Sequence, residues 1–398
     1  MARICRLQLT MLLNRLRRVT RDGRWIPEVD GLRFIAIFSV ILFHMLNEMT
    51  GRIGPVEAGY RWLEQPLSNG FRGVTLFFVI SGMILALPFA RQYLLGAKPV
   101  SLRKYYLRRV TRLEPPYLAS LLLIVLMIVV YRHGIPDGLL PHAWATAFYQ
   151  HSLIYGKWSS ISGVTWSLEV EIQFYLLAPF AMQIYRLRHT ALRRSLLLAC
   201  ILLIGFAQIP FFTWPRLRLS ILFYVQYFLM GILVADIFVL HLNKMKSSWM
   251  WDVAGLAALG AAFWMTHDGV WAHILIPLAF FVLFVAAMRS HGLRRILANP
   301  WIAVIGGMCY SIYLLHYTLI LAMFKVTRKA FIPGAPFFVN YWIQFLLVVV
   351  PVVAMCAVFF VLVERPCMDP NWPSKLWHNL TGRQAIEAEA VNARGVAD

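Results

Sequence analysis

The stretch LRFIAIFSVILFHML, residues 32–46, decides how this chain folds. It is apolar enough to enter a bilayer as a helix, yet it carries Arg33 at its start and His44 near its far end. Ionisable side chains in such segments are costly and mark functional sites. At a rise of about 1.5 Å per residue, the two groups lie roughly 16 Å apart along a helix axis. A cation near one membrane face and an imidazole near the other predict chemistry that reaches across the membrane.

The whole chain has the composition of a polytopic membrane protein. Of its 398 residues, 60% are hydrophobic and only 14% are charged, whereas about a quarter of the residues are charged in soluble domains. The mean hydropathy is +0.65. The apolar runs are continuous over roughly twenty residues, which indicates membrane-spanning helices rather than strands with alternating polarity. We therefore predict an all-α fold in a lipid bilayer.

About ten transmembrane helices are predicted, with both termini in the cytoplasm. The inner segments then carry 27 Lys and Arg against 10 in the outer segments, which is the bias typical of cytoplasmic loops. This placement accounts for the net charge of +20 without nucleic acid as a partner. The predicted spans are 32–48, 73–90, 113–131, 164–185, 195–214, 219–240, 249–266, 271–288, 301–324 and 338–363.

Three regions of the chain differ in composition. We predict a basic cytoplasmic N-terminal segment (1–27), a membrane domain (28–366) and a disordered cytoplasmic tail (367–398). The five cysteines include no CxxC pair, and the eleven histidines lack metal-ligand spacing. We therefore predict no metal site and no disulfide framework.

Five stretches of the membrane domain together carry a family resemblance. They are PEVDGLRFIAIFSVILFH (27–44), RGVTLFFVISGMIL (72–85), YYLRRVTRLEPPY (105–117), TWSLEVEIQFYLLAP (165–179) and CYSIYLLH (309–316), followed by VERP (363–366). In this order they resemble the acyltransferase-3 family of integral-membrane O-acyltransferases. The resemblance implies transfer of an acyl group, acetyl or longer, from acyl-CoA to a hydroxyl group, with no permanently bound cofactor. It also implies a bacterial inner membrane and a glycan or glycolipid acceptor; homo-oligomerisation is left open.

His44 and Glu171 form the predicted catalytic pair. His44 falls near the outer end of the first span, and Glu171 lies about two turns into the fourth, which enters from outside. A neutral imidazole can act as general base on a hydroxyl, and a carboxylate can orient it. Hydrogen bonding to neighbouring helices is the structural alternative for both residues. Glu169 faces another side of the helix, and the family's W-S-L-x-x-E pattern selects Glu171. His316 is the alternative base.

Three arginines are predicted to bind the phosphates of acyl-CoA. Arg33 lies within the first apolar run, and Arg109 and Arg112 are three apart, so that they share a helix face. All three lie at the cytoplasmic side of the predicted topology, and guanidinium groups bind phosphate bidentately. Arginines in this position otherwise serve as topology anchors, which is the role we assign to Arg103 and Arg108.

Six further polar residues are predicted to line the acceptor path or to support the site. For Ser81, the neighbouring Gly82 predicts close helix packing as an alternative role. Glu364 and Arg365 end the last span at the cytoplasm, where they either pair with neighbouring residues or brace the donor site. Asp30 is expected to cap the first helix. The six residues are Ser81, Tyr175, Ser311, His316, Glu364 and Arg365.

Two other classes of function fit part of this pattern. A transporter or flippase also places His, Glu and Arg within the membrane. The sequence, however, shows no internal repeat and no matching pair of Gly- or Pro-interrupted spans. A non-catalytic scaffold leaves the combination of motifs unexplained. We therefore prefer the acyltransferase hypothesis, in which direct transfer and a transient acyl-enzyme are both open.

Overall fold

The computed structural model describes residues 13, 15–18, 25–208, 214–266, 270–369 and 372–374. This part of the chain is helical and contains no strand. Eight helical stretches are long and apolar enough to cross a membrane. The shorter helices α8 (Trp166–Ala181) and α12 (Met250–Trp264) lie at two further predicted spans, so the structure is roughly consistent with the predicted count of about ten. The prediction of an all-α multi-pass membrane protein is confirmed. Most of segment 1–27 and of tail 367–398 lies outside the described residues.

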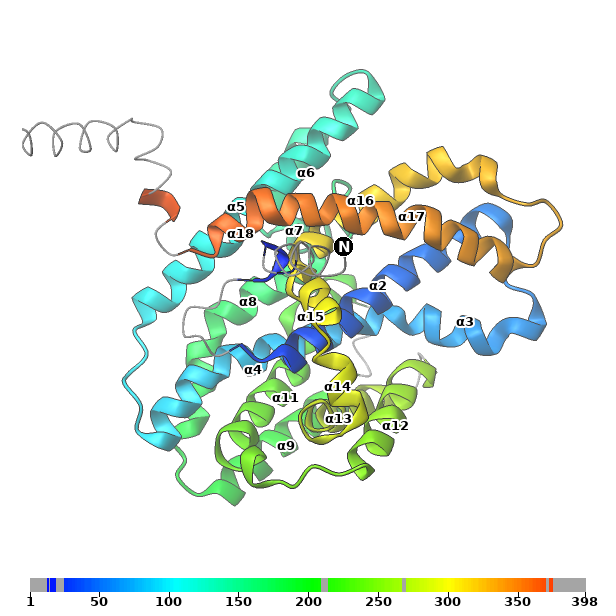
Figure 1. The fold of residues 1–398 in the computed structure, drawn as a ribbon. Coiled ribbons are helices and arrows are strands. Elements are labelled where there is room, and N and C mark those ends of the chain that lie inside the picture. The colour runs from blue at the N-terminus through cyan, green and yellow to red at the C-terminus, as the bar shows by residue number, and fades with distance from the viewer. Residues whose placement is uncertain are drawn as a thin grey trace, which may run out of the picture.

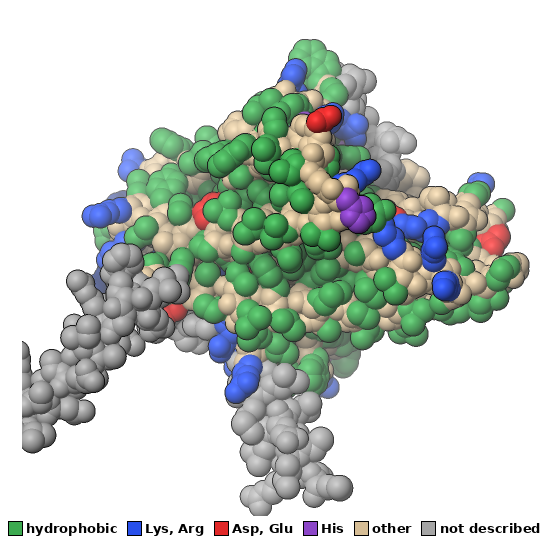
Figure 2. Space-filling view, turned by 90° about the horizontal axis from the view of Figure 1, so that it is seen from above, with side chains coloured by type: hydrophobic (Ala, Val, Ile, Leu, Met, Phe, Trp, Pro, Cys, Tyr) green, Lys and Arg blue, Asp and Glu red, His purple; other side chains and the backbone are tan. Residues whose placement is uncertain are grey.

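The remaining helices divide into long and short ones. The long helices are α2 (Pro27–Ile53), α4 (Arg72–Leu95), α5 (Leu102–Arg132), α9 (Thr190–Ala207), α11 (Ile221–Leu240), α13 (Val270–Arg289), α16 (Cys309–Thr327) and α17 (Phe337–Phe359). The short helices are α3 (Arg61–Ser68), α6 (Leu139–Ala147), α7 (His151–Tyr155), α10 (Pro215–Arg218), α14 (Gly292–Leu297), α15 (Pro300–Gly307) and α18 (Arg365–Cys367). Figure 2 shows hydrophobic side chains over most of one face, with Lys and Arg grouped toward its edges.

Helix α2 lies between two groups of helices and contributes to the hydrophobic core of each. In Figure 1 it runs through the middle of the molecule, with α9, α11, α12 and α13 on one side and α16 and α17 on the other. Residues at helical spacing give α2 two apolar faces. The first face consists of Val29, Leu32, Ala36 and Val40, and the second of Ile37, Ile41, Met45 and Met49.

Glycines allow two close helix contacts. Gly82 in α4 lies against the backbone of Phe228 in α11, where an added Cβ would collide with the carbonyl group, which confirms the predicted close approach. Gly306 in α15 lies in the same way against the carbonyl oxygen of Asp30 in α2. The prediction of one continuous helix over 301–324 is wrong, because α15 ends beside α2 and α16 begins after Met308. Adjacent glycines favour such a break, since glycine is a poor helix former.

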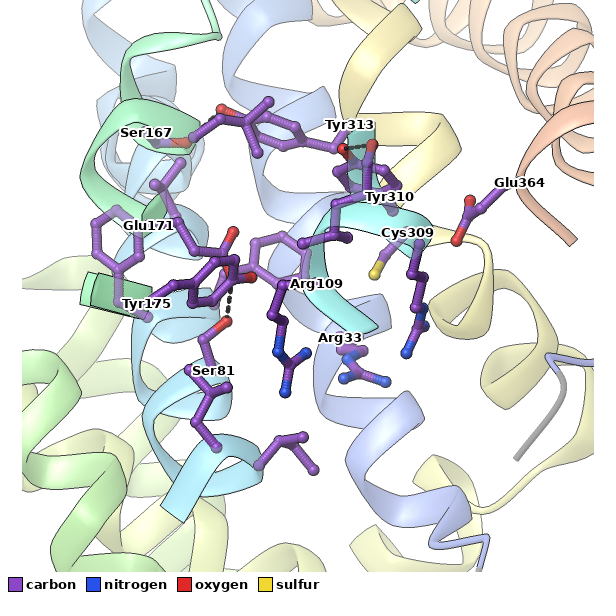
Figure 3. Close-up of a pocket in the computed structure, with 18 of the residues that line it drawn as sticks. Arg33, Ser81, Arg109, Ser167, Glu171, Tyr175, Cys309, Tyr310, Tyr313 and Glu364 are labelled. Atoms are coloured by element: carbon purple, nitrogen blue, oxygen red, sulfur yellow. Dashed lines mark hydrogen bonds between the residues drawn. The ribbon is translucent and has the colours of Figure 1, made fainter. Parts of the chain in front are cut away.

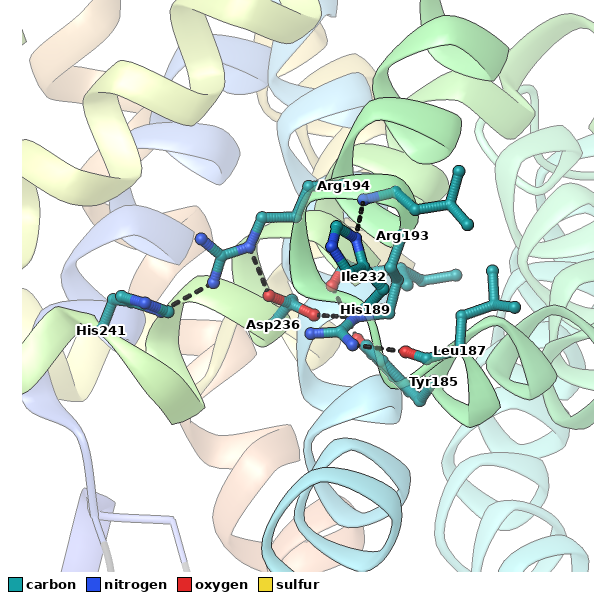
Figure 4. A network of polar contacts seen from close by, with 9 residues as sticks. Tyr185, Leu187, His189, Arg193, Arg194, Ile232, Asp236 and His241 are labelled. Carbon is teal, nitrogen blue, oxygen red and sulfur yellow. Dashed lines mark hydrogen bonds and ion pairs between the residues drawn. The ribbon is translucent and has the colours of Figure 1, made fainter.

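A buried ion-pair network joins α9 to α11 (Figure 4). The carboxylate of Asp236 accepts hydrogen bonds from Nε of Arg193 at 2.5 Å and from Nε of Arg194 at 2.6 Å. The Tyr185 hydroxyl donates to the carbonyl oxygen of Ile232 at 2.6 Å. Asp236 and Arg193 are both fully buried. A buried arginine needs such a carboxylate, because an unpaired buried charge is strongly destabilising.

The C-terminal end of α12 is held by polar side chains that precede or begin α4. Arg72 Nη1 donates to the carbonyl oxygens of Ala262 and Met265 at 2.7 and 2.9 Å. Asn69 Nδ2 donates to the carbonyl oxygen of Phe263 at 2.7 Å. The last carbonyl groups of a helix have no partner within it. These side chains therefore stabilise an apolar helix that is too short to cross a bilayer in full.

Candidate active site

A cavity lies between the two groups of helices (Figure 3). Its volume is about 130 Å³, below the roughly 300–1,000 Å³ of sites that enclose a drug-sized ligand. It has room for one end of a substrate rather than for a whole nucleotide. Its polar lining consists of Arg18, Arg33, Arg109, Arg112, Ser81, Ser167, Glu171, Tyr175, Cys309, Tyr310, Tyr313 and Glu364.

Arg33 lines this cavity while its guanidinium is held by Asp30. Arg33 Nη1 lies 2.6 Å from Asp30 Oδ1, which also accepts from Arg18 Nη1 at 3.0 Å. Trp25 Nε1 donates to the other carboxylate oxygen at 2.8 Å. The expectation that Asp30 caps the first helix is wrong, because Ile26 occupies the N-cap. Asp30 lies one turn further, where it is 2% exposed and orients two arginines.

Arg109 and Arg112 line the cavity without a carboxylate partner. Neither forms an ion pair or a side-chain hydrogen bond with any described residue, and Arg109 Nε is buried without a partner. The Arg109 guanidinium lies over the ring of Tyr175, with its Cζ 5.4 Å from the ring centroid. Buried charges are costly unless they are paired. These two arginines therefore form a site that favours an anion.

Glu171 lies deeper in the cavity and binds two hydroxyl groups. Its Oε1 accepts from the Ser81 hydroxyl in α4 and from the Tyr175 hydroxyl one turn along α8, each at 2.5 Å. Figure 3 shows Glu171, Tyr175 and Ser81 grouped together to one side of Arg109. The structure thus brings together three residues that the sequence analysis had selected on separate grounds. Because the ring of Tyr175 also contacts Arg109, the carboxylate and the cation are linked through one tyrosine.

Glu364 connects the last helices to the start of α16. Its Oε2 accepts from the backbone N–H of Ser311 at 2.9 Å and from the Ser311 hydroxyl at 2.5 Å. Glu364 lines the cavity, so that the expected bracing of the donor side fits its position. Arg365 is not among the residues that line the cavity in the described chain. Its Nε donates to the carbonyl oxygen of Arg17 at 3.4 Å.

Ser167 and Tyr313 close the other end of the cavity. The two hydroxyl oxygens are 2.5 Å apart, and the Tyr313 hydroxyl donates to the carbonyl oxygen of Val164. The ring centroid of Tyr313 lies 5.9 Å from that of His316. Tyr313 therefore separates the arginine-lined cavity from the histidines beyond it.

His44 packs against His316 rather than against a carboxylate. Their ring centroids are 5.2 Å apart, and the Tyr317 ring lies 4.6 Å from His44. His316 Nδ1 lies 3.0 and 2.9 Å from the carbonyl oxygens of Ile312 and Tyr313, so this nitrogen carries the proton. Its Nε2 is buried and has no partner among the described residues. His316 thus presents an acceptor nitrogen inside the protein beside His44.

The expected contact between Glu171 and His44 is not formed. No hydrogen bond joins them in the part of the chain that the structure describes; Glu171 binds Ser81 instead. The contact was predicted because both residues have the same predicted depth in the membrane. The ends of a span fix this depth but not the direction in which a side chain points. The separation of the two α8 carboxylates is confirmed. Glu169 points to α7, where its Oε2 accepts from the backbone N–H of Ser152 at 2.9 Å.

Comparison with known families decides the class of this membrane domain. The model of the acyltransferase-3 family, described as an acyltransferase domain, matches residues 26–361. The chain belongs to this family. The match includes α2, the arginine pair of α5, and α8, whereas Arg18 and Glu364 lie outside it. No solved structure gives a significant match.

Several curated relatives are similar to the acyltransferase domain. O-acetyltransferase OatA of Staphylococcus aureus is 25% identical over 324 residues, which cover 75% of this chain and 51% of the relative. Peptidoglycan O-acetyltransferase OatA of Listeria monocytogenes is 28% identical over 182 residues, 43% of this chain and 26% of the relative. The putative peptidoglycan O-acetyltransferase YrhL of Bacillus subtilis is 29% identical over 173 residues, 40% and 24% of the two chains. The chain thus spans about half the length of the first relative, and the matches to the other two cover about a quarter of theirs.

Several site residues were missed by the sequence analysis. Ser167, Tyr310 and Tyr313 lie inside the quoted stretches TWSLEVEIQFYLLAP and CYSIYLLH, so the signal was present but unspecific. Tyr310 and Tyr313 are three apart and share a helix face, which could have predicted their joint exposure to the cavity. Arg18 had no such signal, because it stands among seven arginines of the first 27 residues.

Proposed function

We propose that this protein is an O-acetyltransferase of the bacterial inner membrane, with both termini in the cytoplasm. It moves an acetyl group from cytoplasmic acyl-CoA to a hydroxyl of an extracytoplasmic glycan. The observation that carries the proposal is the pair Arg109 and Arg112, which face a membrane-embedded cavity without a described carboxylate partner. Coenzyme A supplies phosphates that would neutralise them. The peptidoglycan O-acetyltransferase names of similar proteins favour a cell-wall glycan as acceptor.

In this proposal the donor enters from the arginine side. Arg33, Arg109 and Arg112 hold its phosphates, and the acetyl-pantetheine arm extends past Glu171 toward Tyr313. The cavity, with a volume of about 130 Å³, is too small for the whole donor, so the nucleoside of coenzyme A lies outside it. The arm reaches His44 once the contact between Ser167 and Tyr313 opens.

His44 then acts as the general base. It takes the proton of the acceptor hydroxyl while the oxygen attacks the thioester carbonyl, so that a C–O bond forms as the C–S bond breaks. The proton passes from His44 to the departing CoA thiolate. An imidazolium has two N–H donors, and His316 Nε2 is an acceptor beside it. His316 therefore replaces Glu171 as the group that stabilises protonated His44, and Glu171 orients the hydroxyls of Ser81 and Tyr175.

A direct test combines purified protein with cells. Purified protein in lipid nanodiscs should release CoA thiol from acetyl-CoA, faster when a soluble glycan fragment is present. A deletion strain should lose O-acetyl esters from its cell-wall glycan by mass spectrometry, and the intact gene should restore them. A transporter or flippase would release no thiol and would leave the acetyl content of each exported glycan unchanged. That result would overturn the proposal.

Glu171→Gln should lower kcat roughly 10- to 100-fold, because a charge-assisted hydrogen bond is worth about 1.5–3 kcal/mol. The amide keeps the shape of the carboxylate but holds the hydroxyls of Ser81 and Tyr175 less strongly. Since one negative charge leaves a cationic cavity, the KM for acetyl-CoA should not rise. Steady-state kinetics at varied donor concentration measure both parameters.

Glu169→Gln is the matched control for this substitution. It removes the same charge from the same helix, but from the face that binds Ser152 of α7. Its kcat should stay close to the parental value. Equal losses of kcat in the two variants, or a higher KM for Glu171→Gln without a lower kcat, would exclude the proposed role of Glu171.

A further inference from the structure

A short piece of the N-terminal segment lies against the membrane domain. Leu13 and Leu16 pack against the hydrophobic core formed by α2, α16 and α17. Arg17 places its guanidinium over the Trp25 ring, 3.7 Å from the centroid, and its carbonyl oxygen accepts from Arg365. These apolar, cation–π and hydrogen-bond contacts fix the direction in which the next residue, Arg18, points.

Arg18 points into the arginine-lined cavity. Its side chain is 13% exposed, and its aliphatic part runs beside Gly307, where an added Cβ would lie 3.7 Å from Arg18 Cδ. Its Nη1 lies 3.0 Å from Asp30 Oδ1. Its Nε is buried and has no partner in the described chain. The guanidinium thus uses one donor for a carboxylate, while its Nε has no partner in the described chain.

The charges that line the cavity do not balance. Its four arginines share one direct carboxylate partner, Asp30, which is divided between Arg18 and Arg33. The other two carboxylates, Glu171 and Glu364, accept hydrogen bonds from hydroxyl groups and form no direct ion pair, so three carboxylates stand against four arginines. A single phosphate group would not need so many arginines, but coenzyme A carries several phosphate groups. A polyanionic ligand would pair with the guanidinium donors that remain.

We infer that Arg18 is a fourth phosphate-binding residue of the donor site, contributed by the segment that precedes the acyltransferase domain. This inference rests on the proposed function, since it requires acyl-CoA as the donor. Arg18 lies before residues 26–361, so the match to the family model does not contain it. Asp30 orients Arg18 and Arg33 side by side, and a planar guanidinium binds a phosphate group through paired donors.

The test is CoA titration by calorimetry on the full-length protein in nanodiscs of neutral lipid. Arg18→Gln should weaken CoA binding roughly 10- to 100-fold, the loss expected for one charge-assisted contact. Arg15→Gln is the matched control: Arg15 belongs to the same segment and is exposed. Its CoA affinity should equal that of the parent.

Two further variants separate the possible failures. Arg33→Gln tests the donor site itself: if it weakens CoA binding while Arg18→Gln does not, the inference about Arg18 is wrong and the proposed function stands. If neither variant changes CoA affinity, the donor site proposed here is wrong as a whole. Arg18→Lys keeps the charge next to Asp30, so it should fold like the parent, and its CoA affinity should lie between those of the parent and Arg18→Gln. Parental CoA affinity in both Arg18 variants would overturn the inference.

A lipid headgroup could supply the same phosphate chemistry. Repeating the titrations in nanodiscs that contain anionic phospholipid distinguishes the two sources. If Arg18 binds the donor, the Arg18→Gln loss persists in both lipids. If Arg18 binds a lipid headgroup, CoA affinity is parental in neutral lipid and only the response to anionic lipid changes, which would contradict a role in the donor site.

Discussion

His44→Ala should lower acetyl transfer by about 10²–10⁴-fold, the usual loss when a general base is removed. The imidazole lies in the C-terminal half of α2, beside the buried acceptor nitrogen of His316. It forms no hydrogen bond with any described residue that would hold two helices together, so the variant should fold. Initial rates of transfer to a soluble glycan, with thermal unfolding as a check, measure the effect.

The control for this substitution is His142→Ala, which removes another histidine from the α6 region. His142 contacts His151 and does not line the cavity or touch His44. Its transfer rate should stay near parental. If well-folded His44→Ala keeps parental transfer while His316→Ala loses it, the base is His316, and the buried Nε2 acts on the acceptor rather than on His44.

The long helices could be predicted from hydropathy, because an apolar segment in the bilayer must satisfy its backbone N–H and C=O groups within its own helix. Hydropathy did not predict the break at Met308, since the run 301–324 is apolar on both sides of it, and the adjacent Gly306 and Gly307 are only a weak local signal. The break follows from a contact with a distant residue, where the backbone of Asp30 lies against Gly306. This break positions Cys309 and Tyr310 at the cavity. A feature that shapes the site therefore depends on contacts between residues that are distant in the sequence.

The site shows the same division between local and long-range information. Arg33, Arg109 and Arg112 were predicted from their motif and their depth, and all three line the cavity. Depth alone also suggested that His44 and Glu171 meet. The helical rotation of α2 and α8 instead turns His44 toward His316 and Glu171 toward α4. A single sequence carries the spacing along each helix but not the choice of neighbour.

Replacing Arg109 and Arg112 together by glutamine should nearly abolish binding of coenzyme A. Two charge-assisted phosphate contacts at about 1.5–3 kcal/mol each correspond to roughly 10²–10⁴-fold in affinity. These side chains have no carboxylate partner among the described residues, so the loss reflects the ligand rather than a broken ion pair. The double lysine variant should bind with intermediate affinity, because an ammonium keeps the charge but loses the bidentate geometry. Calorimetric titration with CoA measures both.

The matched control replaces Arg103 and Arg108 by glutamine. These two arginines stand on the same helix, are exposed and do not line the cavity. Removing them lowers the net charge of α5 by the same amount, so long-range attraction of the anionic donor falls equally in both double variants. Any difference in CoA affinity therefore measures direct contact at Arg109 and Arg112. Equal affinities would mean that α5 attracts the donor only through its overall charge, and the donor phosphates would then bind outside this cavity.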